Sequence, residues 1–214
     1  MFGMEKGIIF MGTPEFALPV LRSLIESPYH VLAAYTQPDK SAGRGQRVGL
    51  SPVKRLAMEY EIPVIQPQTL KSAEVMQGLA DFAPDLIVVA AFGHILPAQV
   101  LSLPRFACLN IHPSLLPAHR GPSPIADAIL CGDPITGVTI ILMDEGMDTG
   151  PIVAQREMDI SDGDNTGSLA QKLSHTGAHL LLETLPGWFD GRFEPQPQDE
   201  ARASYSTLLT NKDS

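Results

Sequence analysis

The chain has 214 residues, of which 44% are hydrophobic and 18% charged, and its formal net charge is −9. This length allows one sizeable hydrophobic core or two small ones, and the composition is that of a globular rather than a disordered protein. The negative charge excludes a surface that binds nucleic acid over its whole extent. Apolar runs such as 86–92 are too short to span a bilayer. We find no signal peptide and expect a cytoplasmic protein without a membrane segment.

The two cysteines, Cys108 and Cys131, have no paired spacing. A metal site or a disulfide framework requires a denser pattern of cysteines. We therefore expect two reduced thiols, as is usual in the cytoplasm.

Short apolar runs alternate with amphipathic stretches through the first 131 residues. We expect strands over residues 7–11, 30–37, 62–65, 86–91 and 106–111, and helices over 14–27, 52–60, 69–83 and 125–131. This alternation predicts an α/β fold with a doubly wound, mostly parallel sheet of Rossmann-like topology. The proline in 62–65 indicates an edge strand. The continuous apolar run 86–91 is typical of a central strand that is covered on both faces.

The remaining third of the chain has a different pattern. Two runs rich in β-branched residues, 137–143 and 152–158, predict an antiparallel hairpin, and a long helix follows over 164–188. Residues 191–214 are polar and contain prolines, so we expect them to be extended or loosely packed. We predict one domain over residues 1–190 and an extension over 191–214.

The first turn, Gly12-Thr13-Pro14, connects an apolar strand to a helix. Thr13 is a suitable N-cap, and Pro14 suits the first helical position. A phosphate cradle is the alternative interpretation of this turn. The glycines of a dinucleotide-binding fingerprint are absent, which favours a plain connection.

Basic residues gather in the segment 40–55, which contains no acid. They are Lys40, Arg44, Arg47, Lys54 and Arg55. The three glycines within residues 38–50 exclude a core segment, so this is either a solvated connection or a cationic arm that contacts phosphates. His119 and Arg120 lie further along, just past two prolines, where we predict a polar rim that can contact a substrate phosphate.

Polar side chains stand at the end of the apolar run 106–111. Asn110 and His112 flank Ile111, so their side chains leave the strand on one face. A later loop carries Asp148, and the Thr-Gly that follows predicts a tight return that aims this carboxylate inward. An amide to bond an oxyanion, an imidazole to move a proton and a carboxylate to orient the imidazole are the groups that acyl transfer needs.

Other chemistries have weaker support in the sequence. Ser114 near His112 suggests a serine hydrolase, but the nucleophile-elbow pattern is missing. His175 and His179 have a spacing that can bind a metal, but no third ligand is placed with them, so we predict no metal. The acids of the loop 144–150 do not have the spacing of a cation-binding loop.

The chain resembles the folate-dependent formyltransferases in three motifs that occur in the same order. They are Asn-x-His, Ser-Leu-Leu-Pro and Asp-x-Gly-x-Asp-Thr-Gly. Here they are Asn110 and His112, residues 114–117, and residues 144–150. The resemblance covers nearly the whole chain. It implies the formyltransferase fold, 10-formyltetrahydrofolate as the formyl donor, and catalytic roles for Asn110, His112 and Asp148.

The resemblance also implies a folate pocket. Its expected residues are Phe92, Gly93, Ile95, Leu96, Pro97, Ser114, Leu115, Leu116, Pro117 and Asp144. The segment 92–97 follows the predicted central strand, and ligands of open α/β sheets bind at that end. It would supply a backbone wall for the pterin ring. The loop pattern alone leaves Asp144 and Glu145 as solvated or structural residues.

Within this superfamily the chain looks most like the methionyl-tRNA formyltransferases. The residues that carry this likeness are 12–16 (Gly-Thr-Pro-Glu-Phe), 36–39 (Thr-Gln-Pro-Asp), 43–45 (Gly-Arg-Gly) and 51–54 (Ser-Pro-Val-Lys). It implies that initiator methionyl-tRNA is the partner and that Arg44, Lys40 and Arg47 contact it. It also implies a small β-barrel domain after Ser214, so we expect a truncated chain, a proteolytic core or a naturally short protein. We also expect a monomer.

Three other activities remain open at this stage. Formyltransferases that act on glycinamide ribonucleotide have a glycine- and serine-rich loop where residues 12–16 stand. Those that act on amino sugars lack the insertion 43–45. Hydrolases of the superfamily use water in place of an amine, and a folate-binding module without its own acceptor site is the non-enzymatic alternative.

Overall fold

The structure is a computed structural model that describes residues 6–42 and 47–207. The chain divides into two compact units, Met1–Leu109 and Asn110–Ser214. The boundary lies within strand β7 (Cys108–His112), and the strand order of the sheet is β5-β2-β1-β6-β7-β8-β9. The predicted doubly wound, mostly parallel α/β fold is confirmed. Whether 1–190 acts as one domain stays a prediction.

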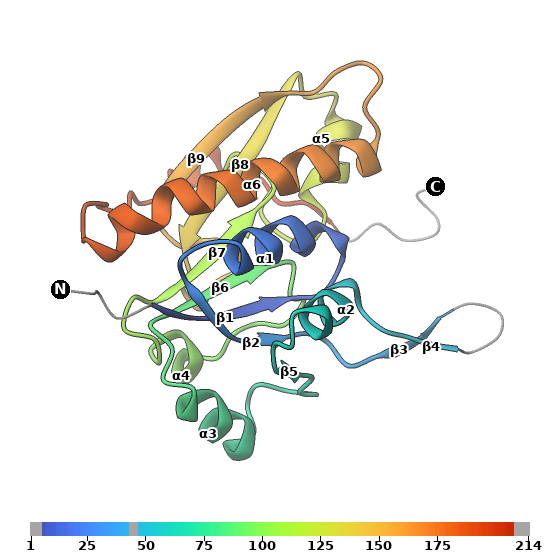
Figure 1. Ribbon diagram of the computed structural model, residues 1–214. Helices are drawn as coiled ribbons and strands as arrows, with labels where there is room; N and C mark the ends of the chain where they lie inside the picture. The colour runs from blue at the N-terminus through green and yellow to red at the C-terminus, as the bar shows by residue number, and fades with distance from the viewer. Residues whose placement is uncertain (1–5, 43–46, 208–214) are drawn as a thin grey trace. The chain divides into compact units, whose positions relative to one another are not determined.

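The first unit contains a parallel sheet with helices on both faces. Its strands are β1 (Gly7–Gly12), β2 (His30–Tyr35), β5 (Val64–Ile65) and β6 (Leu86–Ala90), in the order β5-β2-β1-β6. Its helices are η1 (Glu15–Ala17), α1 (Leu18–Ile25), α2 (Pro52–Glu59), α3 (Ala73–Asp81) and α4 (Ala98–Leu101). Figure 1 shows α3 and α4 on the side of these strands opposite to α1. All five residues of β6 are buried, as predicted for a central strand, and β5 lies at the edge.

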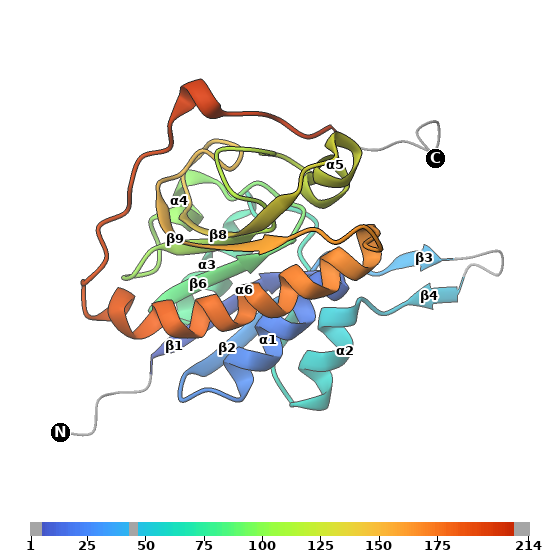
Figure 2. The ribbon, with the colours of Figure 1, turned by 90° about the horizontal axis from the view of Figure 1, so that it is seen from above.

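A second, two-stranded sheet occupies part of the segment that the sequence predicted to be a loop. Strands β3 (Lys40–Ala42) and β4 (Arg47–Gly49) pair antiparallel. Figures 1 and 2 show this hairpin leading away from the main sheet beside α2. The prediction of a loop was wrong here because each strand is only three residues long and one of them ends in Gly49, so the sequence shows no periodic signal.

Two helix starts in the first unit differ from the prediction. Thr13 is no N-cap, because its hydroxyl donates to the Phe92 carbonyl (3.2 Å) and accepts from the Gln37 amide (3.2 Å). Helix α3 begins after Ser72, whose hydroxyl accepts from the Val75 amide (3.3 Å), and not at residue 69. In the first case a long-range contact between loops takes the hydroxyl that sequence reasoning assigned to a local cap.

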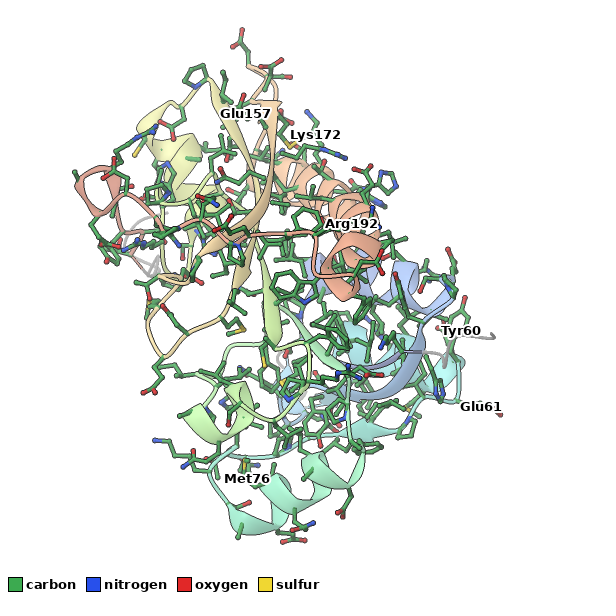
Figure 3. The ribbon with its side chains drawn as sticks, turned by 90° about the vertical axis from the view of Figure 1, so that its left-hand side faces the viewer. Tyr60, Glu61, Met76, Glu157, Lys172 and Arg192 are labelled. Atoms are coloured by element: carbon green, nitrogen blue, oxygen red, sulfur yellow. The ribbon has the colours of Figure 1, made fainter. Side chains whose placement is uncertain are left out.

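The second unit consists of a hairpin covered by a long helix. Its elements are the end of β7, α5 (Pro124–Cys131), β8 (Ile135–Leu142), β9 (Ile152–Asp159), α6 (Thr166–Phe189) and η2 (Glu200–Arg202). The predicted antiparallel pairing of β8 and β9 is confirmed. Helix α6 packs on both strands, and Lys172 and Arg192 lie toward its two ends in Figure 3. A Cβ at Gly177 would lie 2.7 Å from Ile111, so this glycine permits the close approach of α6.

The described residues after α6, up to residue 207, are extended apart from η2, which is one of the two predicted alternatives, and specific contacts hold them rather than loose packing. Figure 2 shows this segment running past β9 and returning to α5. Gln196 pairs with Ile152 through two backbone hydrogen bonds of 2.8 Å, and Tyr205 forms a parallel bridge with Arg120. Backbone hydrogen bonds hold this segment, together with side-chain hydrogen bonds to the buried Arg120. Its polar sequence shows no hydrophobic pattern that would predict this. Among the residues that the structure describes, no helix combines the length and apolarity that crossing a membrane needs.

Candidate active site

Strand β7 delivers two polar side chains to one carboxylate. Asn110 Nδ2 lies 3.4 Å from Asp148 Oδ1, and His112 Nδ1 lies 3.5 Å from the same oxygen. The alternation around Ile111 therefore places both side chains on one face, and the loop between β8 and β9 brings the carboxylate to them. All three residues belong to the second unit.

The Asp148 loop is tightly constrained. Asp148 has a left-handed backbone (φ +56°), a conformation that aspartate adopts more readily than most residues. Its Oδ2 accepts a hydrogen bond from the Gly121 amide (2.8 Å). A Cβ at Gly150 would lie 1.9 Å from the Leu142 carbonyl oxygen, so the return to β9 requires glycine. The tight turn aims the carboxylate inward, where its side chain is 17% exposed.

The hydrogen bonds of His112 fix its tautomer. Its Nε2 lies 3.0 Å from the carbonyl oxygen of His119, which can only accept, so Nε2 carries a proton. In the neutral ring the other nitrogen, Nδ1, then carries a lone pair, and this nitrogen lies 3.5 Å from Asp148 Oδ1. Burial lowers the pKa of His112, although the Asp148 charge acts in the opposite direction. His112 is therefore neutral at pH 7, with Nδ1 as its basic atom.

His119, seven residues later, is in the opposite electrostatic environment. Its Nδ1 lies 2.7 Å from Asp127 Oδ2 and its Nε2 lies 2.6 Å from Asp133 Oδ2. Only the imidazolium can donate to two carboxylates at once. Burial lowers the pKa of His119, but hydrogen bonds and charge from Asp127 and Asp133 outweigh it, so the pKa is raised.

Arg120 is fully buried, which corrects its prediction as part of a polar rim. Its guanidinium donates to Gln198 Oε1 (3.0 and 2.8 Å), to both oxygens of Glu200 (3.0 and 2.7 Å) and to the Tyr205 hydroxyl (3.0 Å). The Glu200 carboxylate raises the pKa of Arg120. Neither Arg120 nor His119 has a donor left for a substrate phosphate. Sequence reasoning missed the Arg120 site because its partners lie 78 to 85 residues away.

The loop after β7 uses its polar atoms internally. The buried Ser114 hydroxyl donates to the Ala118 carbonyl (2.6 Å), so it is not directed as a nucleophile. Thr139 accepts from the Leu116 amide (3.0 Å) and donates to the Ser114 carbonyl (2.7 Å). The Leu116–Pro117 peptide bond is cis. These residues shape the loop, and contact of residues 114–117 with folate stays a prediction.

Asp144 closes its own loop. Its carboxylate accepts from the Gly146 amide (3.0 Å) and from the Thr149 hydroxyl (2.8 and 3.0 Å), and the residue is exposed. This arrangement matches the structural interpretation of Asp144. A folate contact by this residue stays a prediction.

Two side chains of the first unit hold the start of the segment 92–97: Thr13, through its hydrogen bond to the Phe92 carbonyl, and Gln37. Gln37 Nε2 donates to the carbonyl oxygens of Phe92 and Gly93, at 3.2 Å each. Phe92 and Leu96 are buried, whereas Ile95 is 77% exposed. His94 Nε2 is buried without a hydrogen-bond partner among the described residues. The backbone between the two buried side chains is thus fixed, and its proposed contact with folate is untested.

The basic segment is only partly described. Arg44 lies outside the described residues, and for Lys40 and Arg47 only the strand backbone is placed. Lys54 donates to Asp39 (2.5 Å) and to Gln66 Oε1 (2.6 Å), and the hydrogen bond from Lys54 lowers the pKa of Asp39. Lys54 is therefore engaged within the first unit. The roles of Arg44, Lys40 and Arg47 in binding nucleic acid stay predictions.

A family model described as formyl transferase matches residues 6–185, which include Asn110, His112 and Asp148. The chain belongs to the formyl transferase family. The resemblance inferred from the sequence motifs is thereby confirmed.

Curated relatives of this chain are named methionyl-tRNA formyltransferase. The protein from Methylococcus capsulatus is 48% identical over 202 residues, which are 94% of this chain and 66% of the relative. The protein from Caldanaerobacter subterraneus subsp. tengcongensis is 46% identical over 206 residues, 96% of this chain and 67% of the relative. The chain thus spans about two thirds of the length of these relatives.

Solved structures of other formyl transferases share the fold. Phosphoribosylglycinamide formyltransferase from Bacillus halodurans has a TM-score of 0.70 and 31% identity, and the match covers 84% of this chain and 93% of that one. An N-formyltransferase from Helicobacter canadensis has a TM-score of 0.68 and 20% identity, over 98% of this chain and 72% of that one. The second match shows a common fold alone.

Proposed function

We propose that this formyl transferase moves a formyl group from 10-formyltetrahydrofolate to the amino group of initiator methionyl-tRNA. The observation that carries the proposal is the convergence of Asn110 and His112 on Asp148 Oδ1, at 3.4 and 3.5 Å. An amide donor, a neutral imidazole and a carboxylate are the groups that acyl transfer to an amine requires. Relatives that are 46–48% identical and named methionyl-tRNA formyltransferase support the choice of acceptor.

The first step is attack of the amine nitrogen on the formyl carbon. Negative charge develops on the formyl oxygen, and we propose that the Asn110 amide donates a hydrogen bond to it. One such donor typically contributes about 10²- to 10³-fold to the rate. No covalent enzyme intermediate is needed.

Proton movement is the role of His112. Its Nδ1 lone pair accepts the proton that the attacking amine loses, directly or through a water molecule. The imidazolium is then paired with Asp148, which stabilises the new charge. As the carbonyl re-forms and the bond between the formyl carbon and N10 of the folate breaks, N10 takes the proton that the His112 imidazolium gives up, directly or through water. The formylated amine and tetrahydrofolate then leave, and His112 is neutral again. General acid–base catalysis of this kind contributes about 10²- to 10⁴-fold.

In the first unit, we propose that the formyl donor contacts the segment 92–97. The fixed backbone at Gly93 and a His94 Nε2 that has no partner among the described residues suit a flat, polar ring such as a pterin, because a buried ring nitrogen without a partner gains from a polar ligand. For the second unit, taken by itself, we propose folate contacts at residues 114–117 and Asp144. We propose a monomeric, cytoplasmic enzyme that uses no metal.

The acceptor distinguishes this proposal from its alternatives. We expect formyl transfer with methionyl-tRNA and little or none with glycinamide ribonucleotide or an amino sugar. The assay follows conversion of 10-formyltetrahydrofolate with each acceptor and with none. Turnover without any acceptor would indicate a hydrolase. Transfer to a small amine but not to methionyl-tRNA would favour the activity on glycinamide ribonucleotide or on an amino sugar. Folate binding without transfer to any acceptor would favour a folate-binding module.

The cationic arm can be tested separately. Each phosphate contact in duplex-like nucleic acid adds about −0.9 to the slope of log affinity against log salt. We expect Arg44→Ala to raise the KM for methionyl-tRNA and to flatten this slope by about one contact, with little change in folate binding. Affinity and slope equal to those of the wild type would make residues 38–50 a plain solvated connection.

A further inference from the structure

We propose that Gln198 is a positioning residue that holds the backbone of Asp148 and thereby sets the carboxylate beside His112. This inference rests on the proposed function, because it assigns a new residue to the same reaction. Gln198 lies in the segment after α6, outside residues 6–185 that match the family model.

The Gln198 amide uses all of its hydrogen-bonding capacity. Its Oε1 accepts from Arg120 Nε (3.0 Å) and Nη2 (2.8 Å), and its Nε2 donates to the carbonyl oxygens of Asp148 (2.8 Å) and Gly150 (2.7 Å). A primary amide has two donor hydrogens and two acceptor lone pairs, so it is fully satisfied. This one side chain connects a buried guanidinium to the backbone of the proposed catalytic loop.

A second hydrogen bond links the same part of the chain, at Gly121, to the Asp148 carboxylate. Arg120 is followed by Gly121, whose backbone amide donates to Asp148 Oδ2 (2.8 Å). The chain at Arg120 and Gly121 thus holds Asp148 twice, through Gln198 at its carbonyl and through Gly121 at its carboxylate. Two fixed points determine the direction of the short aspartate side chain.

Asp148 needs this support because of its backbone conformation. A non-glycine residue at φ +56° is strained and persists where surrounding contacts hold it. Without the Gln198 donors, the carbonyls of Asp148 and Gly150 lose their partners, and the peptide is free to rotate toward a relaxed conformation. The Asp148 carboxylate then moves relative to His112 Nδ1.

The segment that carries Gln198 is anchored on either side of it. Gln196 pairs with Ile152 through two backbone hydrogen bonds, and Ser204 binds Pro117 and Arg120 through its backbone. Loss of the Gln198 side chain therefore removes the link to Asp148 without releasing the segment. This separation makes positioning testable apart from folding.

The test compares Gln198→Met with Gln198→Glu. Methionine has a similar length and cannot replace the hydrogen bonds, whereas glutamate keeps the acceptors for Arg120 and loses the donors to Asp148 and Gly150. Gln196→Met is the matched control, because the Gln196 side chain is exposed and bonds only to the nearby Glu194 carbonyl (2.8 Å). Turnover, the KM for 10-formyltetrahydrofolate and the thermal unfolding midpoint are measured for all four proteins.

We expect both Gln198 variants to lower kcat by about 10- to 100-fold, the loss that a small misplacement of a catalytic group produces. The folate KM should stay within about twofold, because the change affects the proton-transfer group rather than uniform binding. The Gln196→Met variant should match the wild type. A kcat of Gln198→Glu equal to that of the wild type would overturn the proposal, even where Gln198→Met fails to fold.

A second measurement does not depend on turnover. The His112 ring is titrated by NMR in the wild type, Gln198→Met and Gln196→Met. Displacement of the Asp148 charge should lower the His112 pKa in Gln198→Met alone. An unchanged His112 pKa in folded Gln198→Met would overturn the positioning role. If the wild type transfers no formyl group, the proposed function fails, whereas this titration still decides whether Gln198 positions Asp148.

Discussion

Two histidines seven residues apart, His112 at the end of β7 and His119 in the loop that follows, lie in opposite environments. His112 is buried with one carboxylate at 3.5 Å, and its pKa is lowered. His119 lies between Asp127 and Asp133, at 2.7 and 2.6 Å, and its pKa is raised. The His119 carbonyl accepts the Nε2 proton of His112, so the two environments are coupled through the backbone.

The different environments indicate different roles for His112 and His119. A neutral imidazole with a free Nδ1 can accept a proton, whereas an imidazolium whose two protons are both engaged cannot. His119 therefore serves structure: its charge ties α5 and the turn after it to the loop, and its carbonyl selects the tautomer of His112. Of the two histidines, we propose a role in proton transfer only for His112, and each of the following experiments tests one side of this contrast.

Replacement of the reacting groups should have the largest effect. We expect His112→Ala or Asn110→Ala to lower turnover by about 10²-fold or more, the usual contribution of a proton-transfer group or an oxyanion donor. Folate affinity should change little. Steady-state kinetics check this result. His119→Asn is the comparison variant, and its turnover should fall by less than about 10-fold. Near-wild-type turnover of either variant would remove that residue from the mechanism.

Asp148→Asn should have the next largest effect. It keeps the shape of the side chain and removes the charge that stabilises the His112 imidazolium, so turnover should fall by about 10-fold or more, a part of the usual acid–base contribution. Because the Asp148 charge raises the His112 pKa, its removal should move the acidic limb of the pH–rate profile to lower pH. An unchanged rate and profile would leave Asp148 as a loop-structure residue.

The smallest effect concerns stability and its pH dependence. The folded-state pKa of His119 is raised, so its ion pairs contribute fully below the unfolded value of about 6.5 and are lost as the pH rises through the folded pKa. His119→Asn suits the left-handed backbone at this position (φ +56°). We expect its unfolding midpoint to fall below that of the wild type mainly at acid pH.

The matched control for this experiment is His175→Asn, since His175 is an exposed histidine of α6. Its unfolding midpoint should differ little from that of the wild type at any pH. A difference between the wild type and His119→Asn that is constant from pH 5 to 9 would contradict the cationic state of His119.

Local pattern made a large part of this structure predictable. The alternation around Ile111 predicted that Asn110 and His112 share a face, and the Thr-Gly after Asp148 predicted a tight return. The hairpin of β8 and β9 and the long helix α6 follow from residue periodicity as well. In each case neighbours within a few residues carry the information.

Long-range partners account for what the sequence could not predict. Arg120 and Gln198 are 78 residues apart, and Gln198 lies 50 residues from Asp148, so no spacing pattern announces their contact. The His119 environment depends likewise on how α5 presents Asp127. A polar segment such as the one after α6 is predicted to be loose because its stabilising partners are single side chains in distant loops rather than an apolar face.

The most direct test of the account is NMR of the histidine ring nitrogens at pH 7 in the wild-type protein. We predict a neutral His112 with its proton on Nε2 and an unprotonated Nδ1, together with a His119 that is protonated on both nitrogens. A protonated His112, or a neutral His112 with its proton on Nδ1, would contradict the assignment of Nδ1 as the base in formyl transfer.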